Sequence, residues 1–153
     1  MASVLPINKE LTTPVQVTIW ACILMAVASL AGLLWPQWMY VSEAAVQAFQ
    51  ANDTVNLIVG IPILLVSMLM ARRGILAALL AWPGAFVYSI YNYLAYVIDA
   101  PLGWQTALFI VIVALNVWGA IALLRSLDAA AAIVSTDDDM SDPEDFHGEL
   151  NDG

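Results

Sequence analysis

Side chains that bind metals, form disulfides or carry charge are scarce in this sequence. It has one cysteine and one histidine among 153 residues, and 11% of its residues are charged, whereas a soluble domain carries about 25%. With a single cysteine, the chain cannot form an internal disulfide or a redox-active thiol pair. The one histidine, His147, lies far from any apolar run, which excludes a histidine-ligated haem inside a membrane. No metal site is therefore predicted.

Basic residues are the scarcest charged type, with four Lys and Arg against 13 Asp and Glu. The chain has no basic patch, which excludes nucleic-acid binding. Residues 1–127 hold four acids and four bases, whereas residues 128–153 hold nine acids and no Lys or Arg. The formal net charge of −9 therefore belongs to the C-terminal segment. We predict that residues 128–153 are a disordered acidic tail, because they have few large apolar side chains to bury, and that this tail can attract a basic partner.

Apolar residues are abundant, at 62% of the chain, and they gather in four long runs. The runs cover residues 15–34, 54–71, 75–98 and 104–124. About 18 or more apolar residues are enough to cross the roughly 30 Å hydrocarbon core as a helix. We therefore predict an all-α, polytopic membrane protein in which residues 1–127 form four transmembrane helices.

The bases predict the orientation of these helices. Lys9, Arg72, Arg73 and Arg125 all fall on one side of a four-span chain, and Lys and Arg collect on the cytoplasmic side of membrane proteins. Both termini are therefore predicted to be cytoplasmic, in a multi-pass protein of the cell (inner) membrane. We interpret Arg72, Arg73 and Gly74 as a tight turn that anchors the topology, with binding of anionic lipid headgroups to the two arginines as the alternative.

Local signals predict where the elements begin and bend. Trp35, Trp38 and Tyr40 are typical of a membrane–water interface. Residues 41–50 are too short and polar to span, so we expect a short helix along the interface or an extramembrane loop. Residues 52–54 (Asn-Asp-Thr) are typical of the N-cap of the second span.

Two further features concern the spans themselves. Pro62 and Pro83 lie inside the second and third spans and predict kinks. Ser67 and Asn116 should lie at similar depth and could bond to each other across the second and fourth spans.

Polar residues gather in the outer half of the hairpin formed by the second and third spans. On the third span, Tyr88, Asn92, Tyr96 and Asp99 recur at spacings of four, four and three, so they share one helix face. We predict that this end of the hairpin brings together Asn52, Asp53, Asn56, Tyr88, Asn92, Tyr96 and Asp99. Such a set could form an outward-facing pocket for a lipid headgroup, a quinone-like ring or a cation. The structural alternative is interhelical hydrogen bonding beside an aromatic belt.

Two classes of function stay open. The first is a non-catalytic membrane protein, either a subunit of a membrane complex or a binder of a small lipophilic ligand. The second is an enzyme or carrier that acts on a lipid-like or quinone-like substrate at the polar pocket. No Asp, Glu, Lys, Arg or His lies deep in a span, although proton relays and ion-coupled pumps usually need one. This absence favours the first class, and we assign no catalytic residue and no cofactor.

The central stretch carries a series of short motifs. They are Asn52-Asp53, Asn56-Leu57, Gly60-x-Pro62, Ser67-Met68, Ala71-Arg72-Arg73-Gly74, Trp82-Pro83-Gly84-Ala85 and Tyr91-Asn92-Tyr93. Over residues 52–96 the chain resembles a family of small, uncharacterised prokaryotic integral membrane proteins. The resemblance implies an inner-membrane protein and carries no activity with it.

Overall fold

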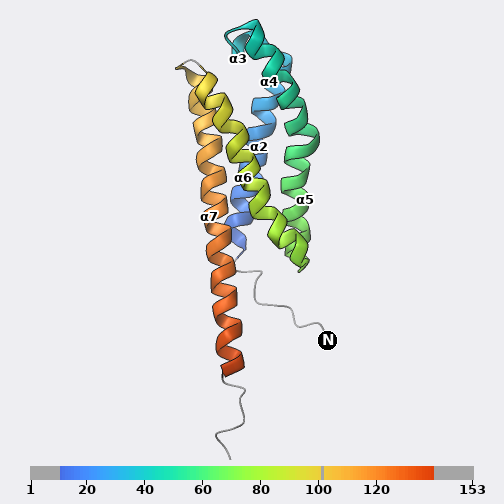
Figure 1. The fold of residues 1–153 in the computed structure, drawn as a ribbon, viewed down its shortest axis with the longest axis vertical. Coiled ribbons are helices and arrows are strands. Elements are labelled where there is room, and N and C mark those ends of the chain that lie inside the picture. Colours follow the sequence, from blue (N-terminus) through green and yellow to red (C-terminus); the bar gives the residue numbers. More distant parts are fainter. Residues whose placement is uncertain (1–10, 101, 140–153) are drawn as a thin grey trace, which may run out of the picture.

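The computed structural model describes residues 11–100 and 102–139, and this part of the chain is built from helices without any strand (Figure 1). The elements in order are α2 (Thr12–Leu34), α3 (Pro36–Met39), α4 (Glu43–Val55), the π-helical turn η1 (Asn56–Gly60), α5 (Ile61–Arg72), α6 (Leu76–Asp99) and α7 (Trp104–Asp139). The predicted all-α fold is confirmed.

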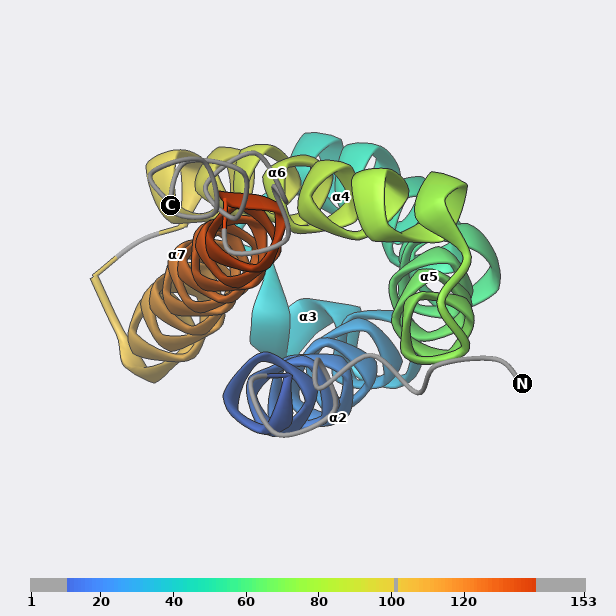
Figure 2. The same ribbon diagram turned by 90° about the horizontal axis from the view of Figure 1, so that it is seen from below.

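Three helices are long and apolar enough to cross a membrane: Thr12–Leu34, Glu43–Arg72 and Trp104–Asp128. The fourth long helix, α6, has 24 residues and is therefore about 36 Å long. Its tyrosines, together with Pro83 and Asn92, make it less apolar than the other three. It packs between α5 and α7 (Figure 2), which gives the predicted bundle of four long helices. The side of the membrane on which the termini lie stays a prediction.

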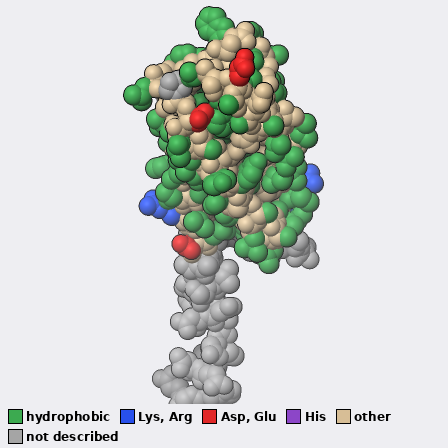
Figure 3. All heavy atoms as spheres, turned by 45° about the horizontal axis from the view of Figure 1, so that its top comes forward, with side chains coloured by type: hydrophobic (Ala, Val, Ile, Leu, Met, Phe, Trp, Pro, Cys, Tyr) green, Lys and Arg blue, Asp and Glu red, His purple; other side chains and the backbone are tan. Residues whose placement is uncertain are grey.

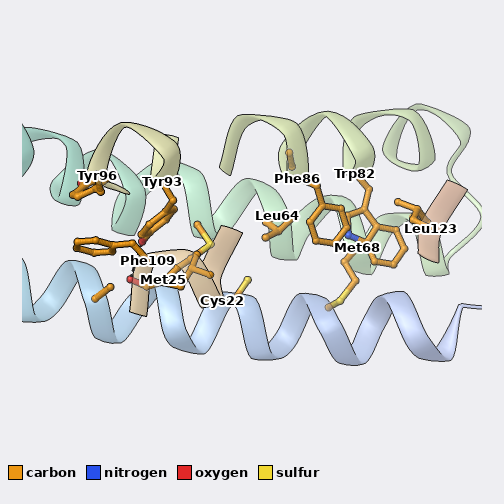
Figure 4. Close-up of a cluster of buried hydrophobic side chains, with 14 of the residues drawn as sticks. Cys22, Met25, Leu64, Met68, Trp82, Phe86, Tyr93, Tyr96, Phe109 and Leu123 are labelled. Atoms are coloured by element: carbon orange, nitrogen blue, oxygen red, sulfur yellow. Dashed lines mark hydrogen bonds between the residues drawn. The ribbon is translucent and has the colours of Figure 1, made fainter. Parts of the chain in front are cut away.

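The core lies where α2, α5, α6 and α7 meet. At one end of it Trp82 and Phe86 pack near Met68, and at the other end Tyr93, Tyr96 and Phe109 form an aromatic group (Figure 4). Thr18 of α2 accepts a hydrogen bond from Trp82 Nε1 of α6 at 3.1 Å. On the face drawn in Figure 3, many apolar side chains lie between the acidic groups near one end and the basic groups towards the other, where one further acidic group lies. A lipid-facing surface requires such an apolar band.

The second long helix begins earlier than the sequence predicted. Ser42 is its N-cap and accepts a hydrogen bond from the Ala45 amide at 3.1 Å. Asn52, Asp53 and Thr54 lie inside the helix, so the predicted N-cap at these residues is wrong. Residues 43–50 are the first turns of this same helix and not a separate interfacial helix. Ser42 followed by Glu43 is an equally good start signal, and no glycine or proline interrupts the chain between Glu43 and Val59.

The bend expected at Pro62 is accommodated by the π-helical turn η1, which comes just before it. Proline lacks the backbone N–H, and its ring clashes with the carbonyl four residues earlier, here that of Ile58. In η1 the Ile61 amide bonds to the Asn56 carbonyl, five residues back. This wider turn holds one residue more than an α-helical turn and shifts the face of α4 relative to α5.

The turn between α5 and α6 matches its prediction. Gly74 has a φ of 81°, a conformation that favours glycine. The Arg73 and Ile75 amides both bond to the Met70 carbonyl, and the Gly74 amide bonds to the Ala71 carbonyl. These bonds close the end of α5 as a glycine C-cap does.

The predicted bond between Ser67 and Asn116 is wrong. The Ser67 hydroxyl donates to the Ile63 carbonyl at 2.7 Å, and Asn116 Nδ2 donates to the Ile112 carbonyl at 2.8 Å. Ser67 therefore bonds within its own helix, and Asn116 bonds within α7 and to Met25 Sδ of α2 at 4.0 Å. The reason is the arrangement of the bundle, in which α5 and α7 each pack on α2 and α6 (Figure 2).

The last helix extends past the predicted end of the fourth span at Leu124. α7 continues as a helix to Asp139, whereas the sequence predicted disorder from residue 128 onwards. Residues 129–132 are four alanines, and residues 128–139 contain no glycine or proline, which favours continuation of a helix. Residues 140–153 of the predicted tail, like Lys9, lie outside the described residues.

Candidate functional site

Six polar residues form a connected, largely buried group where α4 and η1 face α6. They are Tyr40, Asn52, Asp53, Asn56, Asn92 and Tyr96, and we refer to them as the polar cluster. Tyr40 comes from the connection between α3 and α4. The next three residues come from α4 and η1, and the last two come from α6.

Asp53 is the only acidic residue in the cluster, and 1% of its surface is exposed. One carboxylate oxygen accepts a hydrogen bond from the Tyr40 hydroxyl, and the other accepts one from the Tyr96 hydroxyl at 3.0 Å. Burial raises the pKa of Tyr40 above its ordinary value, so this hydroxyl stays protonated and remains a donor. Hydrogen bonds to a charged acceptor are stronger than neutral ones, and here two of them satisfy a carboxylate that has no cation beside it among the described residues.

The close approach of α2 to this carboxylate depends on Gly32. A Cβ at position 32 would overlap the Asp53 carboxylate and the Tyr40 hydroxyl. Glycine has no Cβ, so the backbone of α2 can lie directly against the polar cluster.

Three asparagines continue the cluster from Tyr96 into the helix interface. Asn52 Nδ2 donates to Asn92 Oδ1 at 2.6 Å and to the Tyr96 hydroxyl at 3.1 Å. Asn92 Nδ2 in turn donates to Asn56 Oδ1 at 2.6 Å. Asn56 Nδ2 is buried without a partner among the described residues. The chain of amides therefore joins α4, α6 and η1 through side chains, with one donor left over.

The structure brings together five of the seven predicted site residues. Tyr88 lies beside them: its ring edge is 3.3 Å from the Cβ position of Gly60, and 39% of its surface is exposed. Asp99 is exposed and lines a small cavity with Tyr96. Neither residue hydrogen bonds to the cluster.

The sequence-based prediction missed Tyr40 and Gly32. Tyr40 follows two tryptophans and was interpreted as part of the aromatic belt, and Gly32 gave no signal of its own. Only the folded chain places both residues against Asp53, because they come from segments outside the hairpin.

The cluster leaves little space for a ligand. The cavity beside it measures about 10 Å³ and is lined by Met39, Tyr40, Val41, Phe49, Tyr96, Asp99, Ala100 and Phe109. Such a space holds about one water, whereas pockets for small molecules measure about 300–1,000 Å³. The rings around it are tightly packed, with centroids 4.4 Å apart for Phe49–Tyr96 and 5.0 Å apart for Tyr96–Phe109. This tight packing suits a contact that holds helices together and leaves no room for a small-molecule ligand.

The same residues offer no metal site. Among the described residues, no group of three or more His, Cys, Asp or Glu side chains could hold a metal ion. Cys22 is buried and unpaired in the core. The cluster therefore provides amide and hydroxyl hydrogen-bonding groups around one carboxylate, with two tyrosine hydroxyls as its other ionisable groups.

Two larger hollows lie elsewhere on the bundle. A groove of about 440 Å³ between α5 and α6 has an almost wholly apolar lining that includes Pro62, Val66 and Ala77. The predicted headgroup residues Arg72 and Arg73 are exposed close to the end of this groove but do not line it. A second hollow of about 250 Å³ lies between the start of α2 and α7, and Arg125 is part of its wall.

One comparison with known proteins gives a match. A family model described as cell division protein CrgA matches residues 6–73, which are 68 of the 153 residues. The matched part ends with Arg73 after α5 and includes α2, α3, α4 and η1. It shares residues 52–73 with the resemblance derived from the motifs and excludes α6 and α7. No curated protein and no solved structure matches the chain.

Proposed function

We propose that this protein is a non-catalytic integral membrane subunit of a cell-division complex. The observation that carries the proposal is the closed state of the polar cluster, whose hydroxyls and amides bond to one another, with a cavity of only about 10 Å³ beside them. A site of this kind stabilises helix packing and leaves partner binding to the outer surface. The link to cell division rests on the match of residues 6–73 to the family model of cell division protein CrgA.

The proposal covers location and partners as well. The apolar spans and the distribution of bases support a multi-pass protein of the inner membrane with both termini in the cytoplasm. Its partners would be membrane lipids, other membrane subunits and, for the acidic tail, a basic protein surface.

Part of the outer surface is a candidate for contact with another subunit. Ile19, Ile23, Val27, Leu30 and Leu34 are exposed on α2, at spacings of four, four, three and four, and so lie along one face. This face belongs to the family-matched part of the chain. Ile110 of α7 is similarly exposed and apolar but lies outside that part, so it is a matched control.

The proposal is tested by photo-crosslinking in growing cells. A photoreactive amino acid at Val27 should capture a membrane protein of the division machinery, identified by mass spectrometry, and the same residue at Ile110 should not capture it. A fluorescent fusion of the full chain should concentrate at the division site. An even distribution around the membrane, together with the absence of any division protein crosslinked at Val27, would contradict the proposal.

A further inference from the structure

The hollow between α2 and α7 differs in chemistry from the polar cluster and lies at the opposite end of the bundle. It measures about 250 Å³, and its wall consists of Thr13 from α2 and Trp118, Ile121, Ala122, Arg125 and Ser126 from α7. Thr13 is the second residue of α2, whereas the polar cluster lies near the C-terminal end of that helix. In Figure 1 the start of α2 lies at the same end of the bundle as the turn between α5 and α6, which holds two further arginines.

One end of this hollow is cationic. The Arg125 side chain is exposed and makes no ion pair within the described part of the chain. Asp128 lies about one helical turn further along α7 and forms no ion pair with it. A guanidinium presents several donors in a planar fork that matches phosphate. The exposed Thr13 hydroxyl lines the same hollow and is a second group able to bond to an oxygen-rich headgroup.

The other end of the hollow is apolar and open to lipid. Trp118 and Ile121 are 57% and 42% exposed, and they precede Arg125 by seven and four residues. At about 1.5 Å per residue, Trp118 lies about 10 Å deeper in the span than Arg125. The hollow therefore runs from a cation at the bundle end to an apolar wall inside the membrane.

We propose that this hollow binds an anionic phospholipid, with the phosphate at Arg125 and an acyl chain along Ile121 and Trp118. Charge complementarity selects the anionic headgroup, and the apolar wall selects a lipid over a free phosphate ion. The groove between α5 and α6 has no group that complements an anionic headgroup, because its wall contains no charged residue. The proposal is independent of the proposed role in cell division, since it depends only on the position of α2 and α7 in a membrane.

The test is native mass spectrometry of the full chain in mild detergent, with phosphatidylglycerol or phosphatidylcholine of the same acyl chains added. The wild type should retain one phosphatidylglycerol in clear preference to phosphatidylcholine. Arg125→Gln should reduce this preference about tenfold, the size expected for the loss of a charge-assisted contact. Arg72→Gln removes the same charge outside the hollow and should leave the preference close to that of the wild type.

A second pair of variants tests the apolar end. Ala122→Leu fills the hollow without changing charge and should lower retention of the lipid. Ala77→Leu makes the same change in the groove between α5 and α6 and should leave retention of the lipid unchanged. Thermal melting of each variant in detergent verifies that it is folded.

Three results would overturn the proposal. Equal retention of the two lipids by the wild type would exclude a headgroup site. Equal losses in Arg125→Gln and Arg72→Gln would assign the preference to diffuse charge. Displacement of the lipid by millimolar inorganic phosphate would identify the site as one for the free ion.

Discussion

The packing of this bundle around the buried carboxylate of Asp53 depends on a few individual hydrogen bonds and close contacts. Within the described part of the chain it is balanced by two tyrosine hydroxyls and not by a cation, and it lies against a glycine backbone. A group of this kind is costly to bury unless its hydrogen bonds are complete. Each residue around Asp53 therefore has a narrow range of acceptable side chains.

The clearest prediction at this scale concerns Gly32. The change Gly32→Ala should destabilise the protein by about 1–3 kcal/mol, the usual cost of overpacking, because the new methyl group would overlap the Asp53 carboxylate and the Tyr40 hydroxyl. Thermal melting in detergent measures the effect. Gly84→Ala is the control, since nothing lies within 4 Å of its Cβ position, and its melting temperature should be unchanged or slightly higher. Similar melting of both variants would show that α2 does not lie against the cluster.

Asn92 and Asn116 offer a second comparison, because both are buried asparagines in long helices. Asn92→Leu should lower the free energy of unfolding by about 1–3 kcal/mol, since it removes a partner from both Asn52 and Asn56. Asn116→Leu should lower the free energy of unfolding by less, because Asn116 Oδ1 has no partner among the described residues. Chemical or thermal unfolding of the two variants checks this order. If Asn92→Leu melts like the wild type but abolishes function, Asn92 binds a ligand. The interpretation of the cluster as a purely structural contact between helices would then be wrong.

At the scale of elements, the π-helical turn η1 decides which residues of the second long helix face the cluster. Residues before and after the turn differ in helical phase by one added residue, about 100° of rotation. On this one continuous helix, Asp53 lies against Tyr40 before the turn, and Leu64 and Met68 of α5 lie in the core after it.

Deletion of Ile58 tests this directly. Removing one residue should convert η1 into an α-helical turn while α4 keeps its face towards Tyr40, because the missing residue and the missing wide turn change the helical phase in opposite directions. The Pro62 ring should then clash with the carbonyl four residues earlier, which should lower the free energy of unfolding. Ile58 is exposed, so Ile58→Ala keeps the residue count and should cost little. Denaturation of the two variants in detergent separates the effect of losing the wide turn from the effect of losing the Ile58 side chain. A deletion variant as stable as Ile58→Ala would show that the π turn is not needed.

At the scale of the whole molecule, the basic residues gather at one end of the bundle. Glu43, at the start of α4, and Asp99, at the end of α6, lie at the end that holds the polar cluster, whereas the described arginines lie towards the other, where Asp128 follows Arg125. This asymmetry is the basis of the predicted orientation, with the arginine end in the cytoplasm.

Single cysteines in a Cys22→Ala background check the orientation. Gln47 and Leu102 are exposed at the end that holds the polar cluster, so cysteines there should react with an impermeant thiol reagent added to intact cells. A cysteine at Ser141 should react only after the membrane is opened. Labelling of position 141 in intact cells would reverse the orientation.

Truncation separates the tail from the bundle. Removing the residues after Ala132 should leave the melting temperature nearly unchanged, since α7 extends beyond the other helices there (Figure 1). Truncation after Ala120 removes the buried Leu123 and should lower the melting temperature clearly. A large loss from the first truncation would show that the acidic tail packs on the bundle.

The sequence alone determined the class of protein, the number of long helices and most of the polar cluster. Run length decides membrane insertion because each apolar residue contributes locally to transfer into lipid. The spacing of Asn92 and Tyr96 decides their common face because helix geometry is also local. Gly74 was likewise predictable, since its turn depends on a few adjacent residues.

Tertiary structure decided which faces meet, and the sequence contained no local signal for this. Tyr40 and Gly32 approach Asp53 from other segments of the chain, and Ser67 cannot reach Asn116 because the helices carrying them both pack on α2 and α6. The helix start at Ser42 was ambiguous, because two capping signals lie within twelve residues and packing selects one of them. Whether the polar residues form an open pocket or a closed cluster depends on atomic distances between helices, which no pattern along a single helix specifies.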